Sequence, residues 1–196
     1  MKKIILSMVL IMSLGLYIPH QQVDAATNHY VVQSGDSLWK IGMKHGVSVN
    51  ELKKVNNKKG DVIYPGEKLV IPASISAADR DLLARLVHAE AKGEPYAGKV
   101  AVATVVLNRV DHKDFPDTIR GVIYEFVGGS YAFTPVMNGA INEKADASAY
   151  RAVDEALAFR GQGNGSIYFY NPETATSPWI KSRTITITIG NHHFAK

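Results

Sequence analysis

Two carboxylates four positions apart, Glu90 and Glu94, have the residue type and spacing that could do chemistry in this chain. Glu90 follows Leu86 by four positions, which places it on the apolar face of the helix expected there. Burial raises the pKa of a carboxyl group, and a carboxyl that stays protonated is what a general acid for glycosidic bond cleavage needs. A structural role is the alternative, in which Glu90 bonds a buried amide or an arginine such as Arg85 or Arg109.

Glu94 lies past Gly93, near the expected start of the next helix. A carboxylate at such a position often caps the helix, so capping and a place in a cleft are equally good interpretations. If both carboxylates face one cleft, they form the pair that a glycosidase uses. Four further side chains could support catalysis, bind substrate or pack in the core: Phe133, Thr134, Tyr168 and Tyr170.

Other chemistries find little support. The chain has no cysteine, which excludes thiol peptidases, Cys-ligated zinc and disulfide scaffolds. His88 and Glu90 do not form a His-Glu-x-x-His pattern, and we expect neither a metal site nor a cofactor. No serine lies in a full Gly-x-Ser-x-Gly context. The glycine-rich segment 161–165 follows a helix instead of opening one, so a flexible connector is a better interpretation than a phosphate loop.

The part of the chain from residue 78 onward, which contains both carboxylates, is expected to form helices first and a small antiparallel sheet last, an α+β arrangement. Residues 127–142 are expected to be a loop. We predict that Val100, Ala103, Thr104 and Leu107 form the buried face of the second helix. The helices are expected to run from near Asp79 to a stop at Gly93, from Glu94-Pro95 onward, from Asp117 to near Glu125 and from Asp146 to Phe159, and the strands to span 166–170 and 184–189.

Residues 28–72 are expected to be a separate small βααβ unit, followed by a short linker at 73–77. Asp36 or Ser37 is expected to cap its first helix, Gly46 to end it, and Asn56-Asn57 to stop its second. Gly35, Asp36 and Ser37 have the chemistry of a turn and a helix cap, whatever else they do. The net charge of the chain is +4, and its basic excess lies in this unit, which favours an anionic cell surface over nucleic acid as the partner.

This unit resembles a LysM domain. The resemblance rests on Tyr30-Val31-Val32-Gln33-Ser34-Gly35-Asp36-Ser37-Leu38-Trp39, on Asn56-Asn57 and on Ile63-Tyr64-Pro65-Gly66-Glu67-Lys68-Leu69-Val70-Ile71-Pro72. LysM domains bind glycans that contain N-acetylglucosamine, such as peptidoglycan or chitin. The resemblance implies that the sugar lies between two loops, one with Gly35, Asp36 and Ser37 and the other with Ile63, Tyr64 and Pro65.

Residues 78–196 resemble the SleB-type, or spore cortex-lytic, cell wall hydrolases. The resemblance rests on Glu90-Ala91-Lys92-Gly93-Glu94-Pro95, on Tyr131-Ala132-Phe133-Thr134-Pro135-Val136, on Tyr168-Phe169-Tyr170-Asn171-Pro172 and on Ile189-Gly190-Asn191-His192-His193-Phe194. It implies a lysozyme-like or lytic-transglycosylase-like α+β fold with the first Glu of the first block, Glu90, as the catalytic acid. Members of the family usually carry a different peptidoglycan-binding module, which leaves spore cortex and vegetative wall both open as the setting.

The resulting expectation is a peptidoglycan-degrading enzyme that cleaves the bond between N-acetylmuramic acid and N-acetylglucosamine by lytic transglycosylation, with Glu90 as both acid and base. Water attack assisted by Glu94 is one alternative mechanism. The alternative functions are an N-acetylmuramoyl-L-alanine amidase, for which no zinc ligand set is seen, and a non-catalytic wall-binding protein.

The first 25 residues are expected to be a secretory signal peptide. Lys2 and Lys3 precede an almost wholly apolar stretch from Ile4 to Ile18, and Ala25 ends a plausible cleavage site. The expected location is therefore outside the cell, in the wall or spore envelope, with no stable membrane insertion after cleavage. Peptidoglycan strands are the expected partner, and nucleic acid is not.

Overall fold

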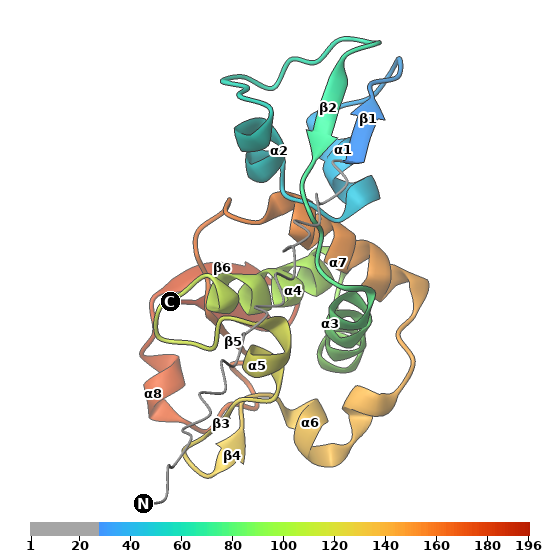
Figure 1. The fold of residues 1–196 in the computed structure, drawn as a ribbon. Coiled ribbons are helices and arrows are strands. Elements are labelled where there is room, and N and C mark those ends of the chain that lie inside the picture. Colours follow the sequence, from blue (N-terminus) through green and yellow to red (C-terminus); the bar gives the residue numbers. More distant parts are fainter. Residues whose placement is uncertain (1–27) are drawn as a thin grey trace, which may run out of the picture.

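The computed structural model describes residues 28–196, so the expected signal peptide at 1–25 lies outside the described residues. The ribbon in Figure 1 shows a small unit of strands and short helices above a larger group of helices with a short sheet beside it. This mixture of helices and small antiparallel sheets confirms the α+β expectation. Among residues 28–196, no helix is both long and apolar enough to cross a bilayer.

The small unit has the expected βααβ order. Strand β1 (Asn28–Val31) pairs antiparallel with β2 (Lys68–Ile71), and helices α1 (Leu38–His45) and α2 (Val49–Val55) lie between them in the chain. Ser37 caps α1 by accepting the backbone N–H of Lys40, and Gly46 ends it in the left-handed conformation. The core of the unit is small and consists of Val32, Leu38, Ile41, Val47, Leu52, Leu69 and Ile71.

The larger unit is built around helix α4 (Tyr96–Val110), which packs against α3 (Ala77–Glu90) and α7 (Ala147–Phe159). Ser76 caps α3 and Asp146 caps α7, each by accepting a backbone N–H of the first turn. The predicted buried face of α4 is wrong at two of its four residues. Val100 and Thr104 are only partly buried, whereas the fully buried residues are Val102, Ala103, Val105, Val106 and Leu107, because neighbours cover α4 on more than one side.

The segment 127–142, expected to be a loop, contains regular structure. It includes strand β4 (Ser130–Tyr131), paired with β3 (Phe126–Val127), helix α6 (Thr134–Asn138) and a short 3-10 helix, η1 (Ala140–Asn142). The preceding helix α5 (Ile119–Ile123) is capped by Thr118 and not by Asp117. These elements are too short for hydrophobic periodicity to reveal them.

The C-terminal sheet has the strand order β5-β7-β6, all antiparallel. Strands β5 (Tyr168–Tyr170) and β6 (Ile185–Ile189) were expected, but the central strand β7 (His192–Ala195) was missed as a separate element. Gly190 takes a positive φ of 57° at the turn between β6 and β7. The Gly-Asn pair at this turn is a hairpin signal that the sequence contained. A four-residue helix, α8 (Pro178–Lys181), lies between β5 and β6.

The small unit rests on α7 through α1 (Figure 1). The ring of Trp39 meets that of Phe159 edge-on, with 6.3 Å between their centroids. A Cβ placed on Gly42 would lie 2.8 Å from the Val47 carbonyl oxygen, so the turn after α1 requires glycine there, and the same Cβ would lie 3.3 Å from the Cβ of Ala158, so Gly42 also allows the close approach to α7. The side-chain amide of Asn50 donates a hydrogen bond to the Gly161 carbonyl.

Candidate active site

Glu90 is the last residue of α3, and its side chain is half-buried. Burial raises the pKa of its carboxyl group to about 7, and the positive charge of Arg109 opposes this rise without cancelling it. Among residues 28–196, no group donates a hydrogen bond to the Glu90 carboxylate. Arg85, which the structural alternative invoked, bonds Asp81 and the Ile141 carbonyl instead. Glu90 therefore has the protonation behaviour of a general acid near neutral pH.

Arg109 on α4 is the cation whose charge acts on the pKa of Glu90, and only 8% of its surface is exposed. Its Nε donates a hydrogen bond of 2.7 Å to the carbonyl of Ile167. Its guanidinium also lies over the rings of Phe133 and Tyr168, at 5.1 and 5.6 Å from their centroids. These contacts hold Arg109 in place without a salt bridge to Glu90, which leaves the carboxyl group free to exchange a proton.

Glu94 does not cap α4, because Pro95 occupies the cap position and no side chain bonds there. The Glu94 side chain is 7% exposed and turns toward the β6–β7 hairpin. Its Oε2 accepts the backbone N–H of Asn191 at 3.0 Å, and its Oε1 lies 3.8 Å from Nδ1 of His192. A Cβ on Gly190 would come within 2.0 Å of Oε2. Glu94 thus joins the loop after α3 to the hairpin turn.

The structure brings two of the four other expected residues together. Phe133 and Tyr168 both lie against Arg109, but Phe133 is 2% exposed, so it supports the cluster from within the core and cannot stack on a sugar. Tyr168 is half-buried on β5. Tyr170, on the same strand, packs against His193, and Thr134 is exposed at the start of α6.

Sequence reasoning missed the partners of Arg109. The ring of Phe115 lies 5.1 Å from its guanidinium, and Glu125 acts on its charge. A signal for Arg109 itself existed, because it follows the buried Val102 and Val105 by seven and four positions. This is the same pattern of a charged residue on an apolar helix face that identified Glu90.

The two loops expected to bind a sugar in the small unit have different characters. Asp36 and Ser37 are committed to the turn, since Asp36 accepts the backbone N–H of Gln33 and the hydroxyl of Tyr30, and Ser37 caps α1. Gly35 has a φ of 85°, as its turn requires. In the other loop, Tyr64 is 69% exposed, next to the half-buried Ile63 and the exposed Pro65. Tyr64 is the large side chain that this loop offers to a ligand.

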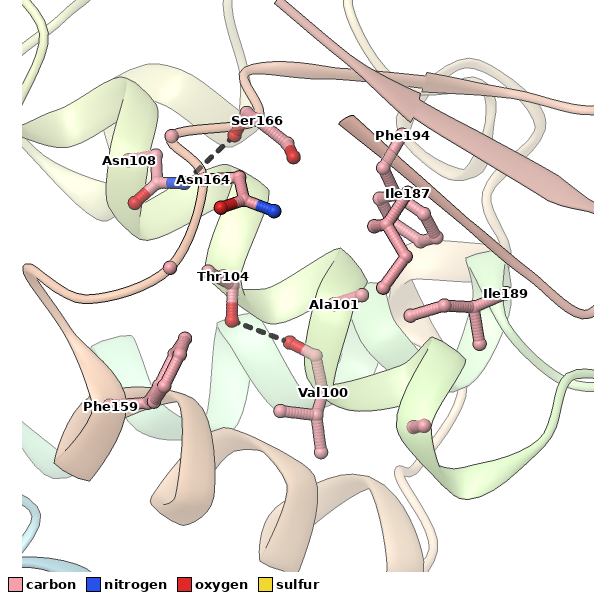
Figure 2. A pocket seen from close by; sticks show the side chains of 13 residues that line it. Val100, Ala101, Thr104, Asn108, Phe159, Asn164, Ser166, Ile187, Ile189 and Phe194 are labelled. Atoms are coloured by element: carbon pink, nitrogen blue, oxygen red, sulfur yellow. Dashed lines mark hydrogen bonds between the residues drawn. The ribbon is translucent and has the colours of Figure 1, made fainter. Parts of the chain in front are cut away.

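Figure 2 shows a mostly apolar groove in the larger unit, with a volume of about 250 Å³. Val100 and Ala101 of α4 form one wall, Ile187 of β6 and Phe194 of β7 form another, and Asn164 lies at the end formed by the loop after α7. None of the expected catalytic or binding residues lines this groove. Within residues 28–196, no group of three His, Asp or Glu side chains could hold a metal ion.

Comparison with known families connects this geometry to a class of enzymes. The sequence profile of the cell wall hydrolase family matches residues 93–195, more than half of the chain. This chain belongs to the cell wall hydrolase family. The LysM profile matches residues 30–72 of the same cell wall hydrolase. The hydrolase match begins three residues after Glu90, so it does not itself include that residue.

Relatives of this cell wall hydrolase have been named and solved. It is 47% identical over 124 residues to a spore cortex-lytic enzyme of Halalkalibacterium halodurans, a match that covers 63% of this chain and 36% of the relative. The catalytic domain of the germination-specific lytic transglycosylase SleB from Bacillus anthracis matches with a TM-score of 0.57 and 41% identity, covering 64% of this chain and all of that one. The catalytic domain of Bacillus cereus SleB matches with the same TM-score, at 42% identity, over 64% of this chain and 95% of that one. The chain spans less than half the length of the curated spore cortex-lytic enzymes it matches.

Proposed function

We propose that this protein degrades peptidoglycan by cleaving the glycosidic bond between N-acetylmuramic acid and N-acetylglucosamine, as a lytic transglycosylase. The observation that carries the proposal is Glu90, a half-buried carboxyl group with a pKa of about 7 and no hydrogen-bond donor among the described residues. Membership of the cell wall hydrolase family and the likeness to a domain named as a lytic transglycosylase support the choice of substrate and reaction.

In the proposed reaction, protonated Glu90 donates its proton to the glycosidic oxygen as the bond to the anomeric carbon of the muramic acid breaks. Positive charge develops at that carbon. The 6-hydroxyl of the same sugar then attacks it, and the Glu90 carboxylate takes the hydroxyl proton, which yields a 1,6-anhydro product and restores the acid. One carboxyl group serves both steps. The geometry of Glu94, directed to the hairpin turn, favours a positioning role over that of a second catalytic carboxylate.

We further propose that the LysM domain, residues 28–72, holds the enzyme on the polymer through Tyr64 and the neighbouring loops. Attachment to an insoluble substrate raises the local concentration of the catalytic domain, residues 78–196. Export by a signal peptide at residues 1–25 would place the protein in the wall or the spore envelope, where peptidoglycan is its partner. The cortex-lytic relatives favour a role in germination.

The test is mass spectrometry of the soluble fragments that residues 26–196 release from purified peptidoglycan. Fragments ending in 1,6-anhydromuramic acid are the expected result, and Glu90→Gln should release none. Glu143→Gln, a change to an exposed carboxylate in only a long contact with Lys92, is the matched control and should remain active. Reducing muramic ends would assign the attack to water, and free peptides without cut glycan would refute the glycosidase assignment.

A further inference from the structure

A groove of about 330 Å³ opens where the LysM domain meets the catalytic domain. Trp39 of α1 lines it together with Asn50 and Lys53 of α2, Asp61 of the following loop, and Gln162 from the loop after α7. In Figure 1 that loop passes beneath α2. The groove is therefore composite, because the LysM domain supplies most of its wall and the catalytic domain supplies Gln162.

We propose that this interdomain groove binds N-acetylated hexosamines of a glycan strand, with Gln162 of the catalytic domain as a contact residue. The proposal rests on the peptidoglycan substrate proposed above and adds a contact residue from the catalytic domain to it. The groove shares Ser37 with the first of the two LysM loops, whereas neither Tyr64 nor Pro65 of the second loop lines it, so the new element is the contact with Gln162.

The lining has the mixed character that a pyranose requires. A sugar ring presents C–H groups on its faces and hydroxyl and acetamido groups at its rim, so its sites combine an aromatic or apolar wall with a few polar side chains. Trp39 is half-buried and lines the groove while its ring meets Phe159 edge-on. The Lys53 and Asp61 side chains, joined at 2.7 Å, supply charged groups to the same lining.

The backbone N–H of Gln162 donates to the Phe159 carbonyl, whereas its side-chain amide makes no hydrogen bond within residues 28–196. A primary amide has two donors and an acceptor, which match the hydroxyl and acetamido groups of a sugar. Asn50, by comparison, already donates to the Gly161 carbonyl, which fixes this loop against α2. The loop is thus held in place while its one long polar side chain remains available.

The arrangement fits a polymer better than a single sugar. Gln162 also lines a second hollow of about 270 Å³ in the catalytic domain, together with Asn108 and His112. Both hollows therefore meet at one side chain. Gly163 keeps the loop close to the core, since a Cβ there would lie 2.9 Å from a ring atom of Phe159. This gives the glycine-rich segment 161–165 a use that a flexible connector would not have.

The test is calorimetric titration of residues 26–196 with the tetramer of N-acetylglucosamine, a soluble probe. Gln162→Ala should raise the Kd about 3- to 10-fold, as expected for the loss of a hydrogen bond to an uncharged group. Asn164→Ala is the matched control, because Asn164 lies in the same loop but lines the groove of Figure 2 instead, and its Kd should equal that of the parent. Tyr64→Ala measures how much the LysM loops contribute to the affinity for the tetramer.

An unchanged Kd in Gln162→Ala, with weakened binding in Tyr64→Ala, would overturn the inference and confine the sugar to the LysM loops. Equal weakening in Gln162→Ala and Asn164→Ala would also overturn it, because the loop as a whole would then be responsible. A second readout uses Trp179→Phe, which leaves Trp39 as the sole tryptophan. Titration with the tetramer should then shift the tryptophan emission, and the Kd obtained from this shift should equal the calorimetric Kd. A constant spectrum at saturation would contradict the site. If residues 26–196 bind the tetramer as described but release no fragments from peptidoglycan, the proposed function is refuted and the binding site stands.

Discussion

The carboxylate of Glu94 accepts the backbone N–H of Asn191 at 3.0 Å, across 97 positions of sequence. This bond ties the loop that follows α3 to the turn between β6 and β7. Glu90 ends α3, so the position of the candidate acid depends on how that loop is held. Gly190 lies so close to the same carboxylate that no larger residue fits without a rearrangement.

Replacement of Glu94 separates positioning from catalysis. In Glu94→Gln the amide oxygen can still accept the Asn191 N–H, so we expect activity within a few-fold of the parent. Glu94→Ala removes the acceptor and should lower the free energy of unfolding by about 1 kcal/mol, a fall in Tm of roughly 2 to 4 °C. Fragment release and calorimetric melting measure the two effects. Complete loss of activity in a well-folded Glu94→Gln would instead make Glu94 the second catalytic carboxylate.

The rate of fragment release should decline as the pH rises through about 7. Burial raises the pKa of Glu90 to about 7, and only the protonated form can act as the acid. Above that pH, kcat/KM should fall about tenfold per pH unit. A soluble muropeptide substrate avoids changes in the charge of the wall itself. Glu143→Gln should retain the same profile, and a rate that stays constant between pH 6 and pH 9 would show that another group donates the proton.

The same pKa predicts a pH-dependent stability difference in Glu90→Gln. The folded pKa of about 7 exceeds the usual carboxyl value of 4.5, so ionisation of Glu90 opposes folding, and this penalty grows between pH 4.5 and 7. At pH 8 the variant should be more stable than the parent by up to about 3 kcal/mol, whereas the two should match near pH 4. Denaturant titrations at both pH values measure this. Equal stability at pH 8 would mean that Glu90 ionises freely.

Arg109 should set the pH at which the rate of fragment release begins to decline. Its positive charge lowers the pKa of Glu90 against the effect of burial. In Arg109→Met that pKa rises, so the decline in rate should begin at a higher pH. The Ile167 carbonyl loses its donor, which should lower the free energy of unfolding by about 1 to 3 kcal/mol. A pH profile on the residual activity distinguishes this electrostatic role from a purely structural one.

The sequence predicted the features that depend on local pattern. The apolar periodicity of α3 placed Glu90 on the buried face, and Gly46 and Asp146 bound their helices as expected. Asp36 and Ser37 were both candidates for the cap of α1, and the structure assigns it to Ser37. What it could not predict depends on tertiary contacts. The burial of α4 follows from the neighbours that surround it, and the aromatic cluster around Arg109 joins three segments that are distant in the chain.

The direction in which the Glu94 side chain points could not be predicted either, because its partner, Asn191, lies near the C-terminus. Capping of α4 and a place in a cleft were equally good local interpretations, and the structure gives the cap position to Pro95. The Gly190-Asn191 turn, by contrast, was a visible hairpin signal. This signal was enough to predict β7 as a strand paired with β6.

The close contact between Gly42 and Ala158 has a mechanical consequence. α1 cannot pivot on the short linker without breaking this contact and the edge-on meeting of Trp39 with Phe159. If the LysM domain binds the glycan strand and Glu90 acts as the acid, as proposed, this docking holds the bound sugar at a constant offset from the bond to be cut. Fragment lengths would then cluster around a preferred repeat number instead of following the broad distribution of an enzyme on a loose tether.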